Sequence, residues 1–376
     1  MAPDFGLQSS IMERNYPINF LDKLSQEGSL FSSAADGSVQ CQACALRCQI
    51  RPGQRGICQV RVNRDGKLFV PWGYVAAAQT DPIEKKPFFH FLPGSRAFTF
   101  GMLGCDFRCS FCQNWEISQT FRDPAAAIGI RSIQETNPAQ IVSAAVRSGS
   151  QMVVSSYNEP LITAEWAAAI FEPAQKAGLY GAIVSNGHAT PQVLHFLKPY
   201  LTALKIDLKS MQAKNYQAMG GKLAPVLETI QLAQQLGIWL EVVTLVIPGF
   251  NDSVTELWET ARFLASVSPA IPWHVTAYHP DYRMDNPPTP PETLQQAADI
   301  GQEAGLNFVY AGNLPGRVGS LENTYCPHCQ TLLIRRSGFN ILDNFITSQG
   351  TCNNCGQKIP GIWSTASVNS QRVKPY

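Results

Sequence analysis

The chain has 376 residues, 45% of them hydrophobic, which is the composition of a globular protein too long for one small core. Its 29 basic and 28 acidic residues leave a formal net charge of +1, so charge gives no reason to expect binding to nucleic acid or to an anionic membrane. The N-terminus does not resemble a secretory signal, and no apolar stretch approaches the roughly 20 residues of a membrane span. We therefore expect a cytoplasmic protein.

The eleven cysteines fall into three groups with none left over, and in a reducing compartment they favour metal sites over disulfides. Two groups have four members and one has three. A structural zinc site takes four ligands, and a [4Fe–4S] cluster is normally held by four thiolates. Three thiolates leave one metal position open, as a reactive site requires. The groups are Cys41, Cys44, Cys48, Cys58; Cys105, Cys109, Cys112; and Cys326, Cys329, Cys352, Cys355.

The N-terminal region predicts a helix over residues 17–28, a loop over 29–37 and a hairpin with strands at 60–62 and 67–70. A linker at 81–87 follows. The first cysteine quartet has the spacing C-x2-C-x3-C-x9-C. Zinc, the preferred alternative, would staple a small subdomain, whereas an auxiliary [4Fe–4S] cluster would relay electrons or bind substrate.

Between residues 97 and about 312, strand-like and helix-like segments alternate, which predicts a parallel sheet with helices outside it. Seven strands are too few for an eightfold barrel, so we expect an open or partial one, with its site at the carboxyl ends of the strands. The expected strands are 97–103, 151–156, 180–185, 203–208, 239–247, 273–278 and 307–311. The expected helices are 138–149, 163–178, 190–199, 224–237, 253–267 and 291–305.

The last cysteine group consists of two C-x2-C pairs separated by 22 residues, after a glycine-rich connection. This pattern predicts a zinc ribbon, with an iron–sulfur cluster as the alternative. We accordingly divide the chain into an N-terminal region (1–95), a core domain (96–313), a zinc-ribbon-like domain (314–364) and a flexible tail (365–376).

The group of three has the spacing C-x3-C-x2-C, with Phe111 directly before its last cysteine. This pattern resembles the radical S-adenosylmethionine (SAM) superfamily. The wider stretch 104–119 resembles the radical SAM component of the AmmeMemoRadiSam system, which is related to the pyruvate formate-lyase activating enzymes. The resemblance, which extends from about residue 41 to 363, implies a partial (β/α)6-type barrel and a [4Fe–4S] cluster whose open iron binds SAM. Reductive cleavage of SAM would give a 5′-deoxyadenosyl radical that abstracts hydrogen.

The resemblance also implies roles for residues at the strand ends. Residues 156–160 occupy the position of the superfamily's Gly-Gly-Glu-Pro motif, so Glu159 would accept a hydrogen bond from the SAM ammonium. Each position also has a structural alternative. Residues 158–160 would cap a helix, and Asn186 would form a turn with Gly187. Asp207 and Lys209 would form an internal salt bridge, and His279 would be a structural histidine. The candidate cofactor-binding residues are Phe111, Asn158, Glu159, Asn186, Asp207, Lys209 and His279.

The resulting prediction is a radical SAM enzyme whose substrate is unidentified, with electrons from a flavodoxin or ferredoxin-like donor. AmmeMemoRadiSam proteins would be possible partners. A glycyl-radical-enzyme activase is one alternative, although the pyruvate formate-lyase activating enzymes of minimal size lack the first quartet. A non-catalytic zinc-binding interaction module is the alternative of another class.

Overall fold

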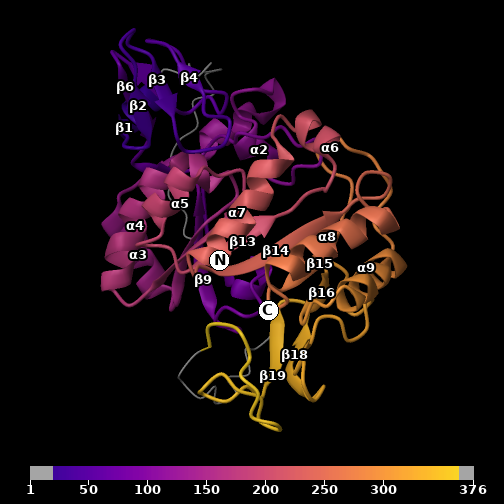
Figure 1. Ribbon diagram of the computed structural model, residues 1–376. Helices are drawn as coiled ribbons and strands as arrows, with labels where there is room; N and C mark the ends of the chain where they lie inside the picture. The colour runs from indigo at the N-terminus through magenta and orange to yellow at the C-terminus, as the bar shows by residue number, and fades with distance from the viewer. Residues whose placement is uncertain (1–19, 364–376) are drawn as a thin grey trace, which may run out of the picture.

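The computed structural model describes residues 20–363 and is organised around one eight-stranded sheet (Figure 1). The strand order is β16-β15-β14-β13-β12-β11-β9-β8, and every pair is parallel except β8 with β9. The strands are β8 (Ala77–Pro82), β9 (Arg96–Gly101), β11 (Met152–Ser155), β12 (Tyr180–Ser185), β13 (Ala203–Asp207), β14 (Trp239–Val246), β15 (Trp273–Ala277) and β16 (Val309–Gly312). Because β8 and β16 do not pair, the sheet is an open barrel, as predicted.

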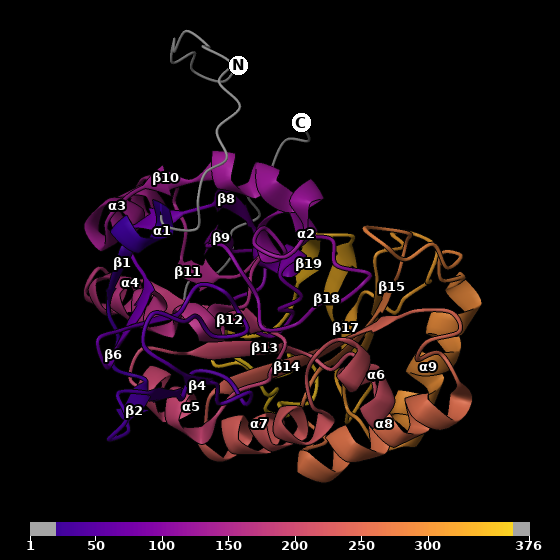
Figure 2. The same cartoon turned by 90° about the horizontal axis from the view of Figure 1, so that it is seen from above.

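Helices connect the parallel strands and lie in an arc around one side of the sheet (Figure 2). They are α3 (Pro138–Arg147), α4 (Ala164–Lys176), α5 (Pro191–Leu197), α6 (Ala213–Ala218), α7 (Leu223–Gln235), α8 (Val254–Val267) and α9 (Pro291–Glu303). Local sequence fixes several starts: Asn137 and Gln140 form a reciprocal capping box ahead of α3, with Pro138 in the first turn. The seven parallel strands and six of these helices confirm the predicted α/β class, and α6 is additional.

The segment between β8 and β9 fills the end of the barrel at which the parallel strands begin. Phe88 and Phe91 are fully buried there against small side chains of the strands, including Ala97, Ala182 and Ala203. The predicted linker at 81–87 is therefore wrong in part, because β8 extends to Pro82 and a 3-10 turn (Ile83–Lys85) follows. The backbone N–H and C=O groups of β8 form hydrogen bonds with β9. The local sequence of β8 does not predict this pairing.

Short strands and turns make up the N-terminal unit. The helix expected over 17–28 is wrong beyond α1 (Phe20–Lys23), because residues 25–27 pair with β6, and its first residues lie outside the described part. A strand also replaces part of the loop expected at 29–37, whereas the hairpin is confirmed with its first strand at 62–64. The strands are β1 (Ser25–Glu27), β2 (Phe31–Ser33), β3 (Val39–Cys41), β4 (Gln49–Ile50), β5 (Val62–Arg64), β6 (Lys67–Pro71) and β7 (Tyr74–Val75). Elsewhere lie α2 (Trp115–Ser118), β10 (Gln134–Glu135) and 3-10 turns at Pro124–Ser132 and Pro160–Thr163.

The C-terminal unit, a meander of β17 (Thr324–Tyr325), β18 (Leu332–Ser337) and β19 (Asn340–Asn344), lies below the sheet in Figure 1. Arg336 of β18 anchors it to the barrel: its guanidinium lies 4.2 Å from the Phe89 ring centroid and donates to the Phe89 carbonyl. The buried Glu241 carboxylate accepts from the backbone N–H groups of Phe89 and His90 and contacts His274. This network places the unit at the amino ends of the strands.

His90 makes this anchor sensitive to pH. Its ring nitrogens contact the Pro360 carbonyl at 2.7 Å and the Tyr310 hydroxyl at 2.6 Å, and burial lowers its pKa from 6.5 to about 4. Between pH 4 and pH 6.5, His90 is protonated in the unfolded chain but not in the folded chain. The contribution of His90 to the free energy of unfolding is therefore fully present above pH 6.5. It is lost as the pH falls toward 4, by roughly 3 kcal/mol in total.

Urea unfolding followed through Trp363, whose ring lies beside His90, would measure this loss. The control is His90→Gln, which cannot titrate, while protonation of the cysteines is common to both proteins. We expect a shallower pH dependence for the variant; equal slopes would assign the effect to other groups.

In residues 20–363, no helix combines the length and apolar character needed to cross a membrane. The tail predicted at 365–376 lies outside the described part of the chain, and the four domain boundaries stay predictions.

Candidate functional site

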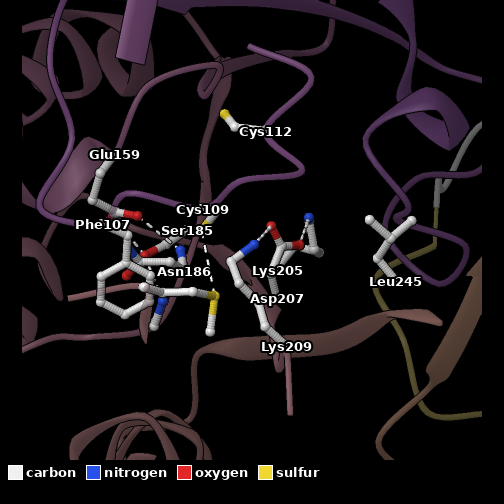
Figure 3. Close-up of polar contacts among 12 residues, drawn as sticks. Phe107, Cys109, Cys112, Glu159, Ser185, Asn186, Lys205, Asp207, Lys209 and Leu245 are labelled. Atoms are coloured by element: carbon white, nitrogen blue, oxygen red, sulfur yellow. Dashed lines mark hydrogen bonds and ion pairs between the residues drawn. The ribbon is translucent and has the colours of Figure 1, made fainter. Parts of the chain in front are cut away.

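The group of three cysteines lies on the loop between β9 and α2, at the carboxyl end of the sheet. Cys109 is buried, and Cys105 and Cys112 are partly buried. All three are free thiols with different neighbours: Cys109 Sγ lies 3.5 Å from Met219 Sδ, and Cys112 Sγ lies 3.2 Å from Ser118 Oγ. Figure 3 shows Cys112 separated from Cys109 across the loop.

The spacing of these sulfur atoms separates two kinds of metal site. In the described residues, two sets of candidate ligands have all their ligand atoms within 4.8 Å of one another, and Cys105, Cys109 and Cys112 are not among them. A single tetrahedral ion would hold its sulfur ligands about 3.8 Å apart. The wider spacing fits a polynuclear cluster, in which each thiolate binds a different iron.

Two buried aromatic rings shield the loop from water. Phe111 packs edge-on against Phe250 on the loop after β14, with ring centroids 5.6 Å apart. Phe107 contacts Tyr216 of α6 and His188. Exclusion of water by these rings would affect the potential of a cluster bound at the loop.

Gly221 leaves room for one of them. A Cβ atom at Gly221 would lie 2.2 Å from the Phe107 ring, and the backbone there shows no left-handed conformation. We expect Gly221→Ala to displace Phe107 and to lower the iron retained after anaerobic reconstitution at least about threefold. The double variant Gly221→Ala/Phe107→Leu should recover part of the iron, because a smaller side chain restores the space. Full iron content in the single variant would contradict the steric argument.

Glu159 follows β11 and is held by the end of β12. Its carboxylate accepts hydrogen bonds from Ser185 Oγ at 2.7 Å and from the backbone N–H groups of Asn186 and Leu161 at 2.8 and 3.1 Å (Figure 3). Burial, and then the Asp106 carboxylate, raise the pKa of Glu159, whereas these hydrogen bonds oppose the rise. An ionised carboxylate has about four acceptor positions, so one remains for a ligand.

The two asparagine candidates are bonded within the protein. Asn158 Oδ1 accepts from the Met102 N–H at 2.9 Å, and Asn186 Nδ2 donates to Asp106 Oδ1 at 2.8 Å. Tyr157, at a glycine position of the superfamily motif, has a φ of 71°, the left-handed conformation that favours glycine. The backbone therefore keeps the shape of a glycine-containing turn without the glycine.

Lys205 and Asp207 lie on one face of β13, Lys209 follows two residues after its end, and Figure 3 shows the three side chains side by side. Asp207 forms ion pairs with Lys205 and, at 3.1 Å, with Lys209. These cations lower the pKa of Asp207 to about 2 against the effect of burial. Lys209 also lies 5.8 Å from the Phe111 ring centroid. The ion pairs of Lys205, Asp207 and Lys209 therefore extend from the barrel interior toward the cysteine loop.

His279 lies apart from this group. Its side chain is exposed, and its Nε2 lies 3.0 Å from Nε2 of Gln113, the residue after Cys112. The structure therefore places His279 at the rim of the site and the remaining candidates in its interior.

Asp106 was not predicted as a site residue. It is fully buried, and its carboxylate accepts from Asn186 and contacts His188 Nδ1 at 3.0 Å. The one available signal was an acidic residue directly after a cysteine of the motif. Met219 was also missed, and its contact with Cys109 arises only through the packing of α6.

The C-terminal quartet forms a compact site. All four sulfur atoms lie within 4.8 Å of one another, with Cys326–Cys355 at 3.6 Å and Cys329–Cys352 at 3.7 Å. These separations match the roughly 3.8 Å expected around one tetrahedral ion. His328, which lies between the first two of these cysteines, is not part of the set.

Comparison with known proteins gives a family match over the core. The model of the Radical SAM superfamily matches residues 100–264. The uncharacterized protein MJ0808 of Methanocaldococcus jannaschii is 38% identical over 338 residues, which covers 89% of this chain and 98% of that protein.

More distant similarities involve proteins with named activities. The isethionate sulfite-lyase activating enzyme of Desulfovibrio desulfuricans is 26% identical over 136 residues, and the match covers 35% of this chain and 43% of the enzyme. A domain of the pyruvate-formate lyase-activating enzyme of Bacteroides vulgatus is 24% identical, with a TM-score of 0.39, over 44% of this chain and all of that domain.

Proposed function

Because the chain belongs to the radical SAM superfamily, we propose that it cleaves SAM reductively at a [4Fe–4S] cluster held by Cys105, Cys109 and Cys112. The single observation that carries the proposal is the loop of three free, widely spaced thiols at the carboxyl end of the sheet. One electron from a bound, reduced cluster breaks the S–C5′ bond of SAM, giving methionine and the 5′-deoxyadenosyl radical that abstracts hydrogen from the substrate.

The residues around the loop would bind and orient SAM. Glu159 offers its remaining acceptor position to the ammonium group, and Asn186 offers the second N–H of its amide, since its Oδ1 already accepts from the His188 N–H. Lys209 has two N–H groups beyond the one given to Asp207, which suit the SAM carboxylate. Phe107 and Phe111 exclude water from the reacting centre. Asn158 would hold the turn before Glu159 in place by accepting a hydrogen bond from the Met102 N–H. His279 would lie at the rim of the site, next to Gln113.

The direct test is anaerobic incubation with dithionite and SAM, followed by measurement of 5′-deoxyadenosine. We expect release of the nucleoside by the iron-loaded protein. A protein that holds only zinc and releases none would overturn the proposal.

Glu159→Gln tests the ammonium contact. A charge-assisted hydrogen bond contributes about 1.5–3 kcal/mol, so we expect at least a tenfold rise in the SAM concentration needed for half-maximal release. Glu172→Gln is the matched control, because Glu172 is exposed on α4 and pairs only with Lys176. Equal SAM dependence in the two variants would remove Glu159 from the site.

The finer assignments are also proposals. A flavodoxin or ferredoxin-like protein would supply the electron, and the C-terminal quartet would bind zinc, as its sulfur spacing supports. Membership of the AmmeMemoRadiSam system, with its partner proteins, rests on the resemblance of residues 104–119. The similarity to an activating enzyme over 136 residues favours glycyl-radical activation as the second candidate function.

Deuterium transfer separates the two candidates. A deuterated partner protein that labels 5′-deoxyadenosine would support activation of a protein, whereas label from a small molecule alone would support modification of a metabolite.

A further inference from the structure

The first cysteine quartet lies directly against the loop of three cysteines. A bridge pairs Cys44 with Ala189, and the N–H of Ala45 donates to the His188 carbonyl at 2.9 Å. On the other side, a Cβ atom at Gly104 would lie 3.0 Å from the Cys58 carbonyl oxygen, so the glycine permits this approach. Residues far apart in the sequence thus place two sets of thiols side by side.

A partly buried arginine connects the two loops. Arg122 Nη2 donates both to the Ile57 carbonyl at 2.5 Å and to the Cys105 carbonyl at 2.6 Å, and Nη1 donates to the Phe107 carbonyl at 2.9 Å. One guanidinium therefore holds the residue before Cys58 against the first cysteine of the radical SAM motif. The distance between the two sets is fixed by hydrogen bonds as well as by packing.

The Asp106 carboxylate stands between the sets. Cys105 Sγ lies 3.7 Å from Asp106 Oδ1, and Cys44 Sγ lies within 4.8 Å of the same carboxylate and of His188. Both nitrogens of His188 are already used: Nε2 accepts from the Lys222 N–H at 3.2 Å, which leaves the proton on Nδ1 for Asp106. Since His188 has no free nitrogen for an ion, these three residues form a bridge between the two sets rather than a metal site.

In the described residues, the four sulfur atoms of the first quartet do not all lie within 4.8 Å of one another, which also holds for the three of the radical SAM motif but not for the C-terminal quartet. Among the described residues, the only all-cysteine set within 4.8 Å is Cys326, Cys329, Cys352 and Cys355. Thiolates on the four irons of a cube stand roughly 6 Å apart, against about 3.8 Å around one zinc ion. The spacing therefore favours a cluster in the first quartet.

An unpaired donor lies beside the first quartet. Arg61 is 1% exposed, and its Nε has no hydrogen-bond partner in the described residues, although its two terminal nitrogens bind Glu165. Glu165, Cys41 and Cys58 raise the pKa of Arg61 against the effect of burial. A thiolate- and sulfide-rich anion would take this donor and balance this charge.

We propose that Cys41, Cys44, Cys48 and Cys58 bind a second iron–sulfur cluster that passes electrons to the radical SAM cluster. One electron leaves the reduced second cluster and reduces the oxidised first cluster. A low-potential flavodoxin or ferredoxin-like protein replaces that electron, and no atom is transferred. This inference rests on the proposed function for the acceptor, but the second site can be detected without SAM cleavage.

The test removes the first cluster and counts what remains. The full chain carrying Cys105→Ala, Cys109→Ala and Cys112→Ala, purified and reconstituted anaerobically, should hold about four iron and four sulfide per chain, against about eight of each in the unmodified protein. Adding Cys41→Ala and Cys44→Ala should bring iron close to zero. The zinc of the C-terminal quartet, about one per chain in every variant, reports correct folding.

Electron paramagnetic resonance of the reduced, unmodified protein gives a second measurement that needs no variant. Two adjacent reduced clusters should show spin–spin broadening, which disappears in the triple variant. About four iron and two zinc per chain in the unmodified protein, or a triple variant with no iron, would overturn the proposal. About eight iron without release of 5′-deoxyadenosine would leave the second cluster standing and overturn the proposed function instead.

Discussion

Replacement of Cys109 by alanine is expected to abolish release of 5′-deoxyadenosine, a loss of at least about a thousandfold. Cys109 is the buried member of the motif, with its sulfur against Met219 on one side and Lys209 nearby. Without it, two thiolates remain to hold a cluster that needs three, and both the iron and its open position are lost. Liquid chromatography of the nucleoside, together with iron analysis, measures the effect.

Ser110→Ala is the matched control for this substitution. Ser110 lies in the same loop, and its backbone carbonyl accepts from the Arg283 N–H at 2.9 Å. We expect this variant to keep its iron and its SAM cleavage within about twofold. Cleavage of SAM by the Cys109 variant, at a rate close to that of the control, would show that the reaction does not use this loop.

Replacement of Arg61 by alanine is expected to lower the apparent free energy of unfolding of the N-terminal unit by about 3–5 kcal/mol. Arg61 and Glu165 are 1% and 6% exposed, and their two hydrogen bonds of 2.8 and 2.6 Å join the N-terminal unit to α4. Removing one partner leaves the Glu165 charge buried without compensation. Urea unfolding followed by fluorescence would measure the loss.

Two further proteins make this prediction specific. Arg61→Met/Glu165→Leu should be more stable than the single variant, because the double change leaves no buried charge. Lys67→Met, which breaks the exposed pair with Glu27 in the same unit, should cost less than about 1 kcal/mol. If Arg61→Ala were no more costly than Lys67→Met, the buried pair would not be what holds the N-terminal unit on the barrel.

Local sequence determined the parts of this protein whose signals are short-range. The parallel strands are buried on both faces and appear as apolar runs, while capping residues such as Asn137 mark helix starts. The spacing of the cysteines predicted the C-terminal quartet, which the structure confirms as a compact set, because ligands of one site often lie close together along the chain. Alternation likewise placed Lys205 and Asp207 of β13 on one side, together with Lys209 two residues beyond the strand.

Tertiary structure decided what depends on contacts between distant segments. Strand β8 and the strand at 25–27 owe their conformation to partners elsewhere in the chain, and local propensity gave no sign of either. The same holds for Asp106, whose carboxylate lies between Cys44 and Cys105 only because residues 42–45 pack on the end of β12. The sequence by itself predicted which thiols form sets, since their spacing is local. Only the fold decided that two of those sets are neighbours, because their distance depends on packing between segments about sixty residues apart.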